Sequence, residues 1–176
     1  MHRQAMGIRK KVLGPEQSST LNSVNNLGLV LSDQGKYEEA EAMYRQALEG
    51  HKKVLGPEHP NTLDSNDNLG LVLKDRGEYE QAEAMHRQAM GIRKKVLGPE
   101  HSITLNSVDN LGLVLRRRGK YEEAEAMYRQ VLEGHKKVLG PEHPSTLNSV
   151  NNLCIVLRKQ AKHEEAEAMH QQVSEQ

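Results

Sequence analysis

The 176-residue sequence contains no phenylalanine, no tryptophan and a single cysteine, and its 24 basic side chains equal its 24 acidic ones. With apolar residues at only 36% of the chain, one thick globular core would be poorly filled. A net charge of zero excludes the global positive field of a protein that binds nucleic acid or anionic membranes regardless of sequence. Cys154 cannot form an internal disulfide, which agrees with a reducing compartment.

Other absences concern membranes and chemistry. No stretch approaches the roughly 20 apolar residues that cross a bilayer, and residues 1–6 lack the apolar core of a signal peptide. The nine histidines lie in separated places without a His-Glu-x-x-His motif, and no P-loop occurs. We therefore expect a cytoplasmic protein with no membrane partner, no metal, no cofactor and no catalytic site.

The sequence does contain a long repeat. The tetrapeptide Leu-Gly-Pro-Glu recurs every 42 residues, beginning at Leu13, Leu55, Leu97 and Leu139. A fixed period of this length is typical of a solenoid, in which each repeat buries its apolar face against its neighbours. We expect a single domain over residues 1–176, made of a half-repeat (1–19), three full repeats (20–61, 62–103 and 104–145) and a truncated repeat (146–176).

Each repeat contains two helical patterns. From Leu21 to Leu31 apolar residues recur at helical spacing, and Gly35 follows as a stop signal, which predicts a first helix (helix A) of about 14 to 16 residues. Tyr37 opens a second periodic run (helix B) of about 18 residues, which Gly56 and Pro57 end. The short joint between the helices predicts an antiparallel hairpin.

Three segments carry a family resemblance: Asn-Asn-Leu-Gly-Leu-Val-Leu (25–31), Gly-Lys-Tyr-Glu-Glu-Ala-Glu (35–41) and Tyr-Arg-Gln-Ala-Leu (44–48). They resemble the tetratricopeptide repeat, whose usual unit has about 34 residues. The 42-residue version with its LGPEHP-type loop is similar to the repeats of kinesin light chains, and such near-identical arrays resemble the sensor regions of fungal NOD-like receptor proteins. The resemblance implies an all-α, right-handed superhelical solenoid of antiparallel hairpins, with Gly28 and Ala40 at positions where the two helices approach closely.

In that family helix A lines the concave face and contributes the ligand contacts. The helix A positions that we predict to bind a peptide are Asn22, Asn25, Asn26, Asp64, Asp67, Asn68, Lys74, Asn106, Asp109, Asn110, Arg116, Arg117, Asn148, Asn151, Asn152 and Arg158. One row of these, Asn26, Asn68, Asn110 and Asn152, forms a hypothetical asparagine ladder. Each amide offers a donor and an acceptor to the main chain of an extended peptide. The alternative is that these amides bond neighbouring helices or water.

The end of helix A changes charge along the chain, from Ser32-Asp33 through Lys74-Asp75 to Arg116-Arg117 and Arg158-Lys159. Arginine and lysine there could hold carboxylates or phosphates of a ligand. The alternative is that they match the helix dipole. We predict a protein or peptide partner with acidic residues toward the C-terminal half of the groove. Nucleic acid is not expected, because aromatic stacking residues are missing.

The function predicted from these patterns is a noncatalytic protein-interaction scaffold, acting as the recognition, sensor or cargo-binding region of a larger protein. The alternative is self-assembly. Residues 1–13 read as a helix B without its covering helix A, so an apolar face would be open, and near-identical repeats can exchange between chains. The alternative therefore predicts swapped or end-to-end homo-oligomers.

Overall fold

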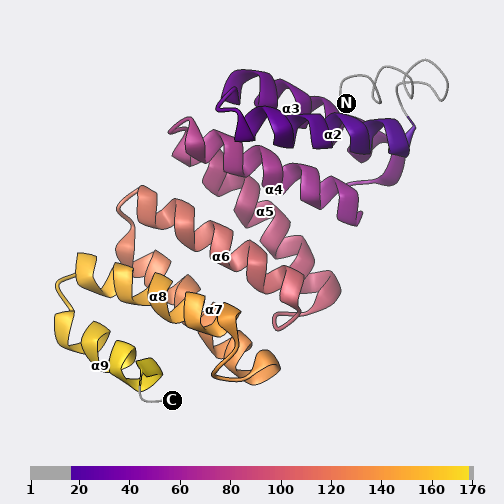
Figure 1. Ribbon diagram of the computed structural model, residues 1–176. Coiled ribbons are helices and arrows are strands. Elements are labelled where there is room, and N and C mark those ends of the chain that lie inside the picture. The colour runs from indigo at the N-terminus through magenta and orange to yellow at the C-terminus, as the bar shows by residue number, and fades with distance from the viewer. Residues whose placement is uncertain (1–16, 175–176) are drawn as a thin grey trace. The chain divides into compact units, whose positions relative to one another are not determined.

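The computed structural model describes residues 17–174, and helices are the only regular secondary structure in this part of the chain (Figure 1). The helices are α2 (Ser18–Asp33), α3 (Tyr37–Leu55), α4 (Pro60–Asp75), α5 (Tyr79–Leu97), α6 (Ser102–Arg117), α7 (Tyr121–Leu139), α8 (Pro144–Lys159) and α9 (His163–Ser174). Helices of 16 residues alternate with helices of 19 until α9, as predicted for helices A and B. None of the described helices is long and apolar enough to cross a membrane.

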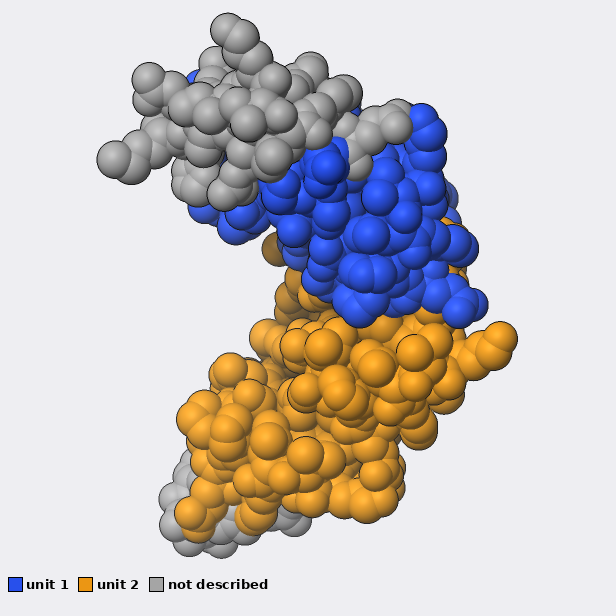
Figure 2. All heavy atoms as spheres, turned by 90° about the vertical axis from the view of Figure 1, so that its right-hand side faces the viewer, with its two compact units in different colours: residues 1–85 blue, residues 86–176 orange. Residues whose placement is uncertain are grey.

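Two compact units, residues 1–85 and 86–176, divide the chain within α5 (Figure 2). In unit 1, α3 packs against both α2 and α4. In unit 2, α6 packs against α7, α7 against α8, and α8 against α9. The hairpins predicted from the short joints are therefore present in both units. The single domain over residues 1–176 stays a prediction, and the half-repeat with its open apolar face lies, up to residue 16, outside the described residues.

Helix A ends in the same way in each described repeat. After α2, the N–H of Lys36 donates to the carbonyl of Leu31 (2.9 Å) and that of Gly35 donates to Ser32 (2.9 Å), which satisfies carbonyls that the helix leaves open. Gly35 has φ +72°, in the left-handed region that glycine adopts without a steric cost. After α8 this position is held by Ala161, with φ +62°. The stop signal read from the sequence is thus confirmed, with one strained exception.

Histidines begin three of the helices A. His59 lies before α4, and its Nδ1 accepts a hydrogen bond from the N–H of Asn61 (3.1 Å). His143 does the same for Ser145 (3.1 Å) before α8, and His101 holds the corresponding place before α6. Since Pro60 and Pro144 at the first helical position lack an N–H, the loops provide both a cap and a fixed helix start.

Within the hairpins, a glycine on helix A packs against a tyrosine ring on helix B, and this contact sets the distance between the two helices. A Cβ on Gly28 would lie 2.8 Å from the ring of Tyr44, and one on Gly112 would lie 2.9 Å from the ring of Tyr128. Both tyrosines are buried, and burial, as the first cause, raises the pKa of each to about 12. The close approach predicted at Gly28 is therefore confirmed. The last repeat has Cys154 at this position, buried, with Sγ 3.4 Å from the carbonyl of Ala166.

Candidate functional site

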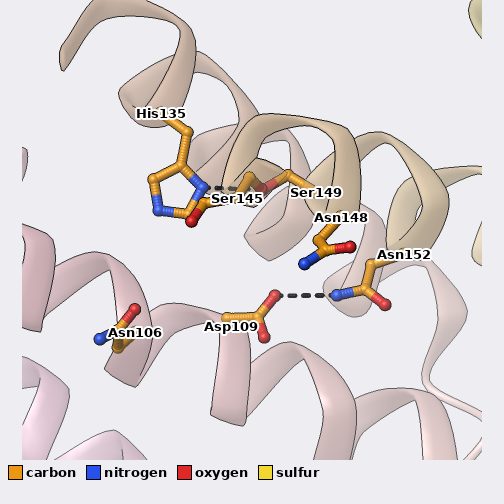
Figure 3. A pocket seen from close by; sticks show the side chains of 7 residues that line it. All are labelled: Asn106, Asp109, His135, Ser145, Asn148, Ser149 and Asn152. Carbon is orange, nitrogen blue, oxygen red and sulfur yellow. Dashed lines mark hydrogen bonds between the residues drawn. The ribbon is translucent and has the colours of Figure 1, made fainter. Parts of the chain in front are cut away.

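A polar pocket of about 170 Å³ opens in unit 2 between α6, the end of α7 and α8 (Figure 3). Its lining residues are Asn106, Asp109, His135, Ser145, Asn148, Ser149 and Asn152. Asn106 and Asp109 come from helix A of one repeat and Asn148 and Asn152 from helix A of the next, because the 42-residue period brings equivalent positions side by side. The pocket exceeds by an order of magnitude the ~10–15 Å³ that one water requires.

On the α7 side the pocket is lined by the buried His135, whose Nδ1 contacts a serine hydroxyl. His135 Nδ1 lies 2.9 Å from Ser149 Oγ, and Ser149 Oγ lies 2.9 Å from the carbonyl oxygen of Ser145. Since the serine has one hydrogen, which it donates to that carbonyl, it accepts from Nδ1. In the neutral form of the imidazole, the proton therefore lies on Nδ1 and the lone pair on Nε2. Figure 3 shows Nε2 on the side of the ring away from Ser149.

The carboxylate of Asp109 lies on the opposite wall. Its Oδ1 accepts a hydrogen bond of 3.1 Å from the side-chain amide of Asn152 (Figure 3). Burial raises the pKa of Asp109, while this hydrogen bond and the charges of His135 and Arg116 act in the opposite direction. The effect of burial is the larger one, so the pKa of Asp109 is raised and its carboxylate is partly desolvated.

A pocket of the same kind, of about 250 Å³, occurs 84 residues earlier in unit 1, lined by Asn22, Asn25, Asn26, His51, Asn61 and Asp64. His51 Nδ1 lies 2.9 Å from Ser65 Oγ, as His135 does from Ser149. His51 is 1% exposed, and its Nε2 is buried. Burial lowers the pKa of His51, and the charge of His59 adds to this, whereas the main chain of Ser18 and the charge of Asp64 oppose it.

The two pockets differ in where their carboxylate stands. The aspartate of unit 2, Asp109, corresponds to Asn25 in unit 1, and the aspartate of unit 1, Asp64, corresponds to Asn148 in unit 2. Each pocket thus contains one histidine, several amides and one carboxylate, with the carboxylate on a different helix A.

The structure brings half of the predicted site residues into these pockets. Those that line one are Asn22, Asn25, Asn26, Asp64, Asn106, Asp109, Asn148 and Asn152. Those that line neither are Asp67, Asn68, Lys74, Asn110, Arg116, Arg117, Asn151 and Arg158. In the second group Asp67 is buried, and Lys74 forms an ion pair with Asp75 (2.9 Å). The assignment of these residues to peptide binding stays a prediction.

Two members of the asparagine ladder already use an amide hydrogen within the chain. Asn152 donates to Asp109 at 3.1 Å, and Asn68 donates to Asn25 at 3.4 Å. For these two residues, pairing with the neighbouring helix A, the alternative raised above, is the contact that the structure contains. Their amide oxygens and second N–H groups are what they can offer to a ligand.

The histidines of the pockets and the serines that they contact are not among the site residues predicted from the sequence. A signal was present, because each repeat has a serine at one place in helix A, 14 residues after a residue that alternates as His51, Arg93 and His135. Arg93 donates from Nη1 to Ser107 Oγ at 2.6 Å, so it replaces the imidazole as the serine's partner. Among the described residues, no group of three or more histidines, cysteines and acidic residues is placed to hold a metal ion.

Comparison with known proteins identifies the family. The model of the tetratricopeptide repeat matches residues 1–53, 18–95, 64–137 and 100–176, which together span the chain. Among solved structures, a kinesin-light-chain-type protein with nearly identical TPR-like repeats from Podosopora anserina is 29% identical, with a TM-score of 0.86, covering 98% of this chain and 82% of its own. None of the curated proteins matches.

Two more distant structures share the fold. BtubC (BKLC) from P. vanneervenii is 18% identical with a TM-score of 0.87, covering 99% of this chain and 69% of its own. The apo form of RapI is 17% identical with a TM-score of 0.82, covering 98% and 60%. With the helices described above, these matches confirm the predicted all-α fold of stacked hairpins. The chain therefore belongs to the tetratricopeptide repeat family, a family of noncatalytic scaffolds whose repeats mediate protein–protein interaction.

Proposed function

We propose that this chain is a noncatalytic scaffold that binds an extended peptide, or an extended segment of a partner protein, on the surface formed by its helices A. The observation that carries the proposal is the recurrence of one polar pocket at equivalent places in both units, each time between consecutive helices A. Recurrent side-chain amides suit a ligand whose own amides recur, and an extended main chain has that property.

The chemistry of the ligand follows from the exposed groups on this surface. Asn106 and Asn148 are exposed, and their amides can pair with the carbonyl and N–H groups of a peptide of any sequence. Arg117 and Arg158 are exposed at the C-terminal ends of α6 and α8, where they suit acidic side chains of the ligand. The ligand is thus a peptide with acidic residues toward the later repeats.

We place this scaffold in the cytoplasm, as the recognition, sensor or cargo-binding region of a larger protein. The similarity to a kinesin-light-chain-type array supports the cargo-binding version. A sensor role like that of NOD-like receptor proteins would use the same surface.

The test begins with a selection from a library of extended peptides, followed by titration of the best one. Replacement of Asn106 and Asn148 by alanine should weaken binding about tenfold, since each removes hydrogen bonds worth about 0.5–1.5 kcal/mol. The matched control replaces Gln46 and Gln88, two exposed amides on helices B, and should leave the affinity unchanged. The proposal would be contradicted if the Asn106 and Asn148 double variant bound the peptide with the same affinity as the Gln46 and Gln88 control. Light scattering of the free chain over a range of concentrations distinguishes this function from the predicted self-assembly.

A further inference from the structure

The buried face of the pocket in unit 2 presents hydrogen-bond acceptors. In unit 2 the single hydrogen of Ser149 goes to the Ser145 carbonyl, so His135 donates from Nδ1 and keeps a lone pair on Nε2. The serine's role as an acceptor is independently visible at Ser107. There the donor is the Arg93 guanidinium, which has no lone pair to offer. A ligand group that meets Nε2 of the neutral imidazole must therefore donate a hydrogen.

The second acceptor is a carboxylate that lacks full solvation. Asp109 shares the pocket with His135, and its charge is opposed by burial. A positively charged ligand group would offset this cost, because an opposite charge nearby favours the ionised carboxylate. Arg116 acts on Asp109 from the same helix, but it does not line the pocket.

Unit 1 repeats the arrangement with the carboxylate moved. His51 lines this pocket as His135 does in unit 2, and Asp64 provides the charge from α4. The imidazole, the single carboxylate and the surrounding amides are the shared features of both pockets, although the carboxylate stands on different helices. Their common ligand is therefore a compact cation with several donors, able to approach from either helix A.

We propose, building on the function proposed above, that each pocket takes a lysine side chain of the bound peptide, its ammonium donating to the carboxylate of Asp109 or Asp64 and to asparagine oxygens, and in unit 2 also to Nε2 of the neutral His135. The ligand is thereby specified further: lysines enter the pockets while acidic residues face the basic ends of α6 and α8.

Lysine fits this chemistry better than arginine. An ammonium group has three donors that point in different directions, which suits acceptors placed on different helices. A guanidinium group prefers both oxygens of one carboxylate, but Asp109 Oδ1 already accepts from Asn152. The alkyl chain of lysine is also flexible enough to follow either position of the carboxylate.

The first experiment titrates the isotope-labelled chain with the peptide acetyl-Gly-Gly-Lys-Gly-Gly-amide and follows side-chain amide and imidazole signals by NMR, which detects dissociation constants in the millimolar range. The same peptide with norleucine in place of lysine is the control, because it keeps the alkyl chain and lacks the charge. We expect the lysine peptide to shift signals of His135, Asn106 and Asn148, and the norleucine peptide to leave them in place. Equal shifts with both peptides, or none with lysine, would overturn the proposal.

The second experiment uses residues that the chain itself supplies. Asp109→Asn puts at this position the residue found at Asn25, so it is compatible with the fold, and it should weaken lysine binding in unit 2 about tenfold. Adding Asn148→Asp restores a carboxylate at the corner where unit 1 has Asp64, and should restore the binding. Glu167→Gln, an equal change of charge on α9, should have no effect.

These outcomes separate the pocket from the scaffold function. One outcome is that peptides from the library bind without containing lysine, with an affinity that Asp109→Asn leaves unchanged. In that case the proposed function stands and the lysine pocket is wrong. If the lysine peptide binds as expected while the library yields no ligand, the pocket stands and the extended-peptide function is wrong.

Discussion

Substitution of Glu125 tests which contacts hold adjacent repeats together in unit 2. It extends from α7, and its carboxylate contacts Arg129 on the same helix (2.7 Å) as well as Gln160 (2.8 Å) and Lys162 (2.8 Å) in the turn between α8 and α9. The side chain of Glu125 is 13% exposed. Replacing it by glutamine keeps its shape but removes the charge that these three donors share.

The magnitude follows from the pKa. Burial alone would raise the pKa of Glu125, but the hydrogen bonds from Lys162, Arg129 and Gln160 outweigh it and lower the pKa from 4.5 to about 2. At about 1.36 kcal/mol per pH unit, this interval sets a ceiling of about 3.4 kcal/mol. Because Arg129 and Lys162 are 46% and 43% exposed, solvent screens the pairs, and we expect about 1–2 kcal/mol.

The sign of the pH dependence is fixed by the lowered pKa. The contribution is complete above the unfolded-state pKa near 4.5 and is lost as the pH falls toward about 2. Urea unfolding of the wild type and Glu125→Gln from neutral to acidic pH measures it, with Glu167→Gln, at the equivalent position of the next repeat, as control. The reasoning is refuted if the difference in unfolding free energy is absent at neutral pH, or does not shrink at acidic pH.

Two predictions concern backbone positions and use the same unfolding assay. Gly112→Ala forces a Cβ to within 2.9 Å of the Tyr128 ring and should cost about 1–3 kcal/mol; an unchanged midpoint would mean that the ring moves aside freely. Ala161→Gly relieves a residue with φ +62° and should raise the stability by about 1 kcal/mol, whereas a loss would show that no strain is stored there.

Much of the fold could be predicted because its determinants are local. The apolar spacing from Leu21 to Leu31 and the stop at Gly35 give α2 within a residue or two, and the same signals recur every 42 residues. The strain at Ala161 was foreseeable in part, because it replaces a glycine that the other repeats keep at a turn.

The site was predicted less completely because it depends on contacts between helices. The amides of Asn106 and Asn148 could be placed on helix A from their period alone, and both line a pocket. The pairing of His135 with Ser149 depends on the angle at which α7 and α8 meet, which no local pattern states. The bond from Asn152 to Asp109 likewise depends on the register of α8 against α6.

The measurement that tests the central claim most directly is residue-resolved mapping by NMR of the chain with a selected peptide. We predict that the signals that move belong to the pocket side chains on helices A, with Asn22, Asn106 and Asn148 among them. If the changes fall instead on the exposed glutamates of α3 and α7, the helices A do not form the binding surface, and the account is wrong.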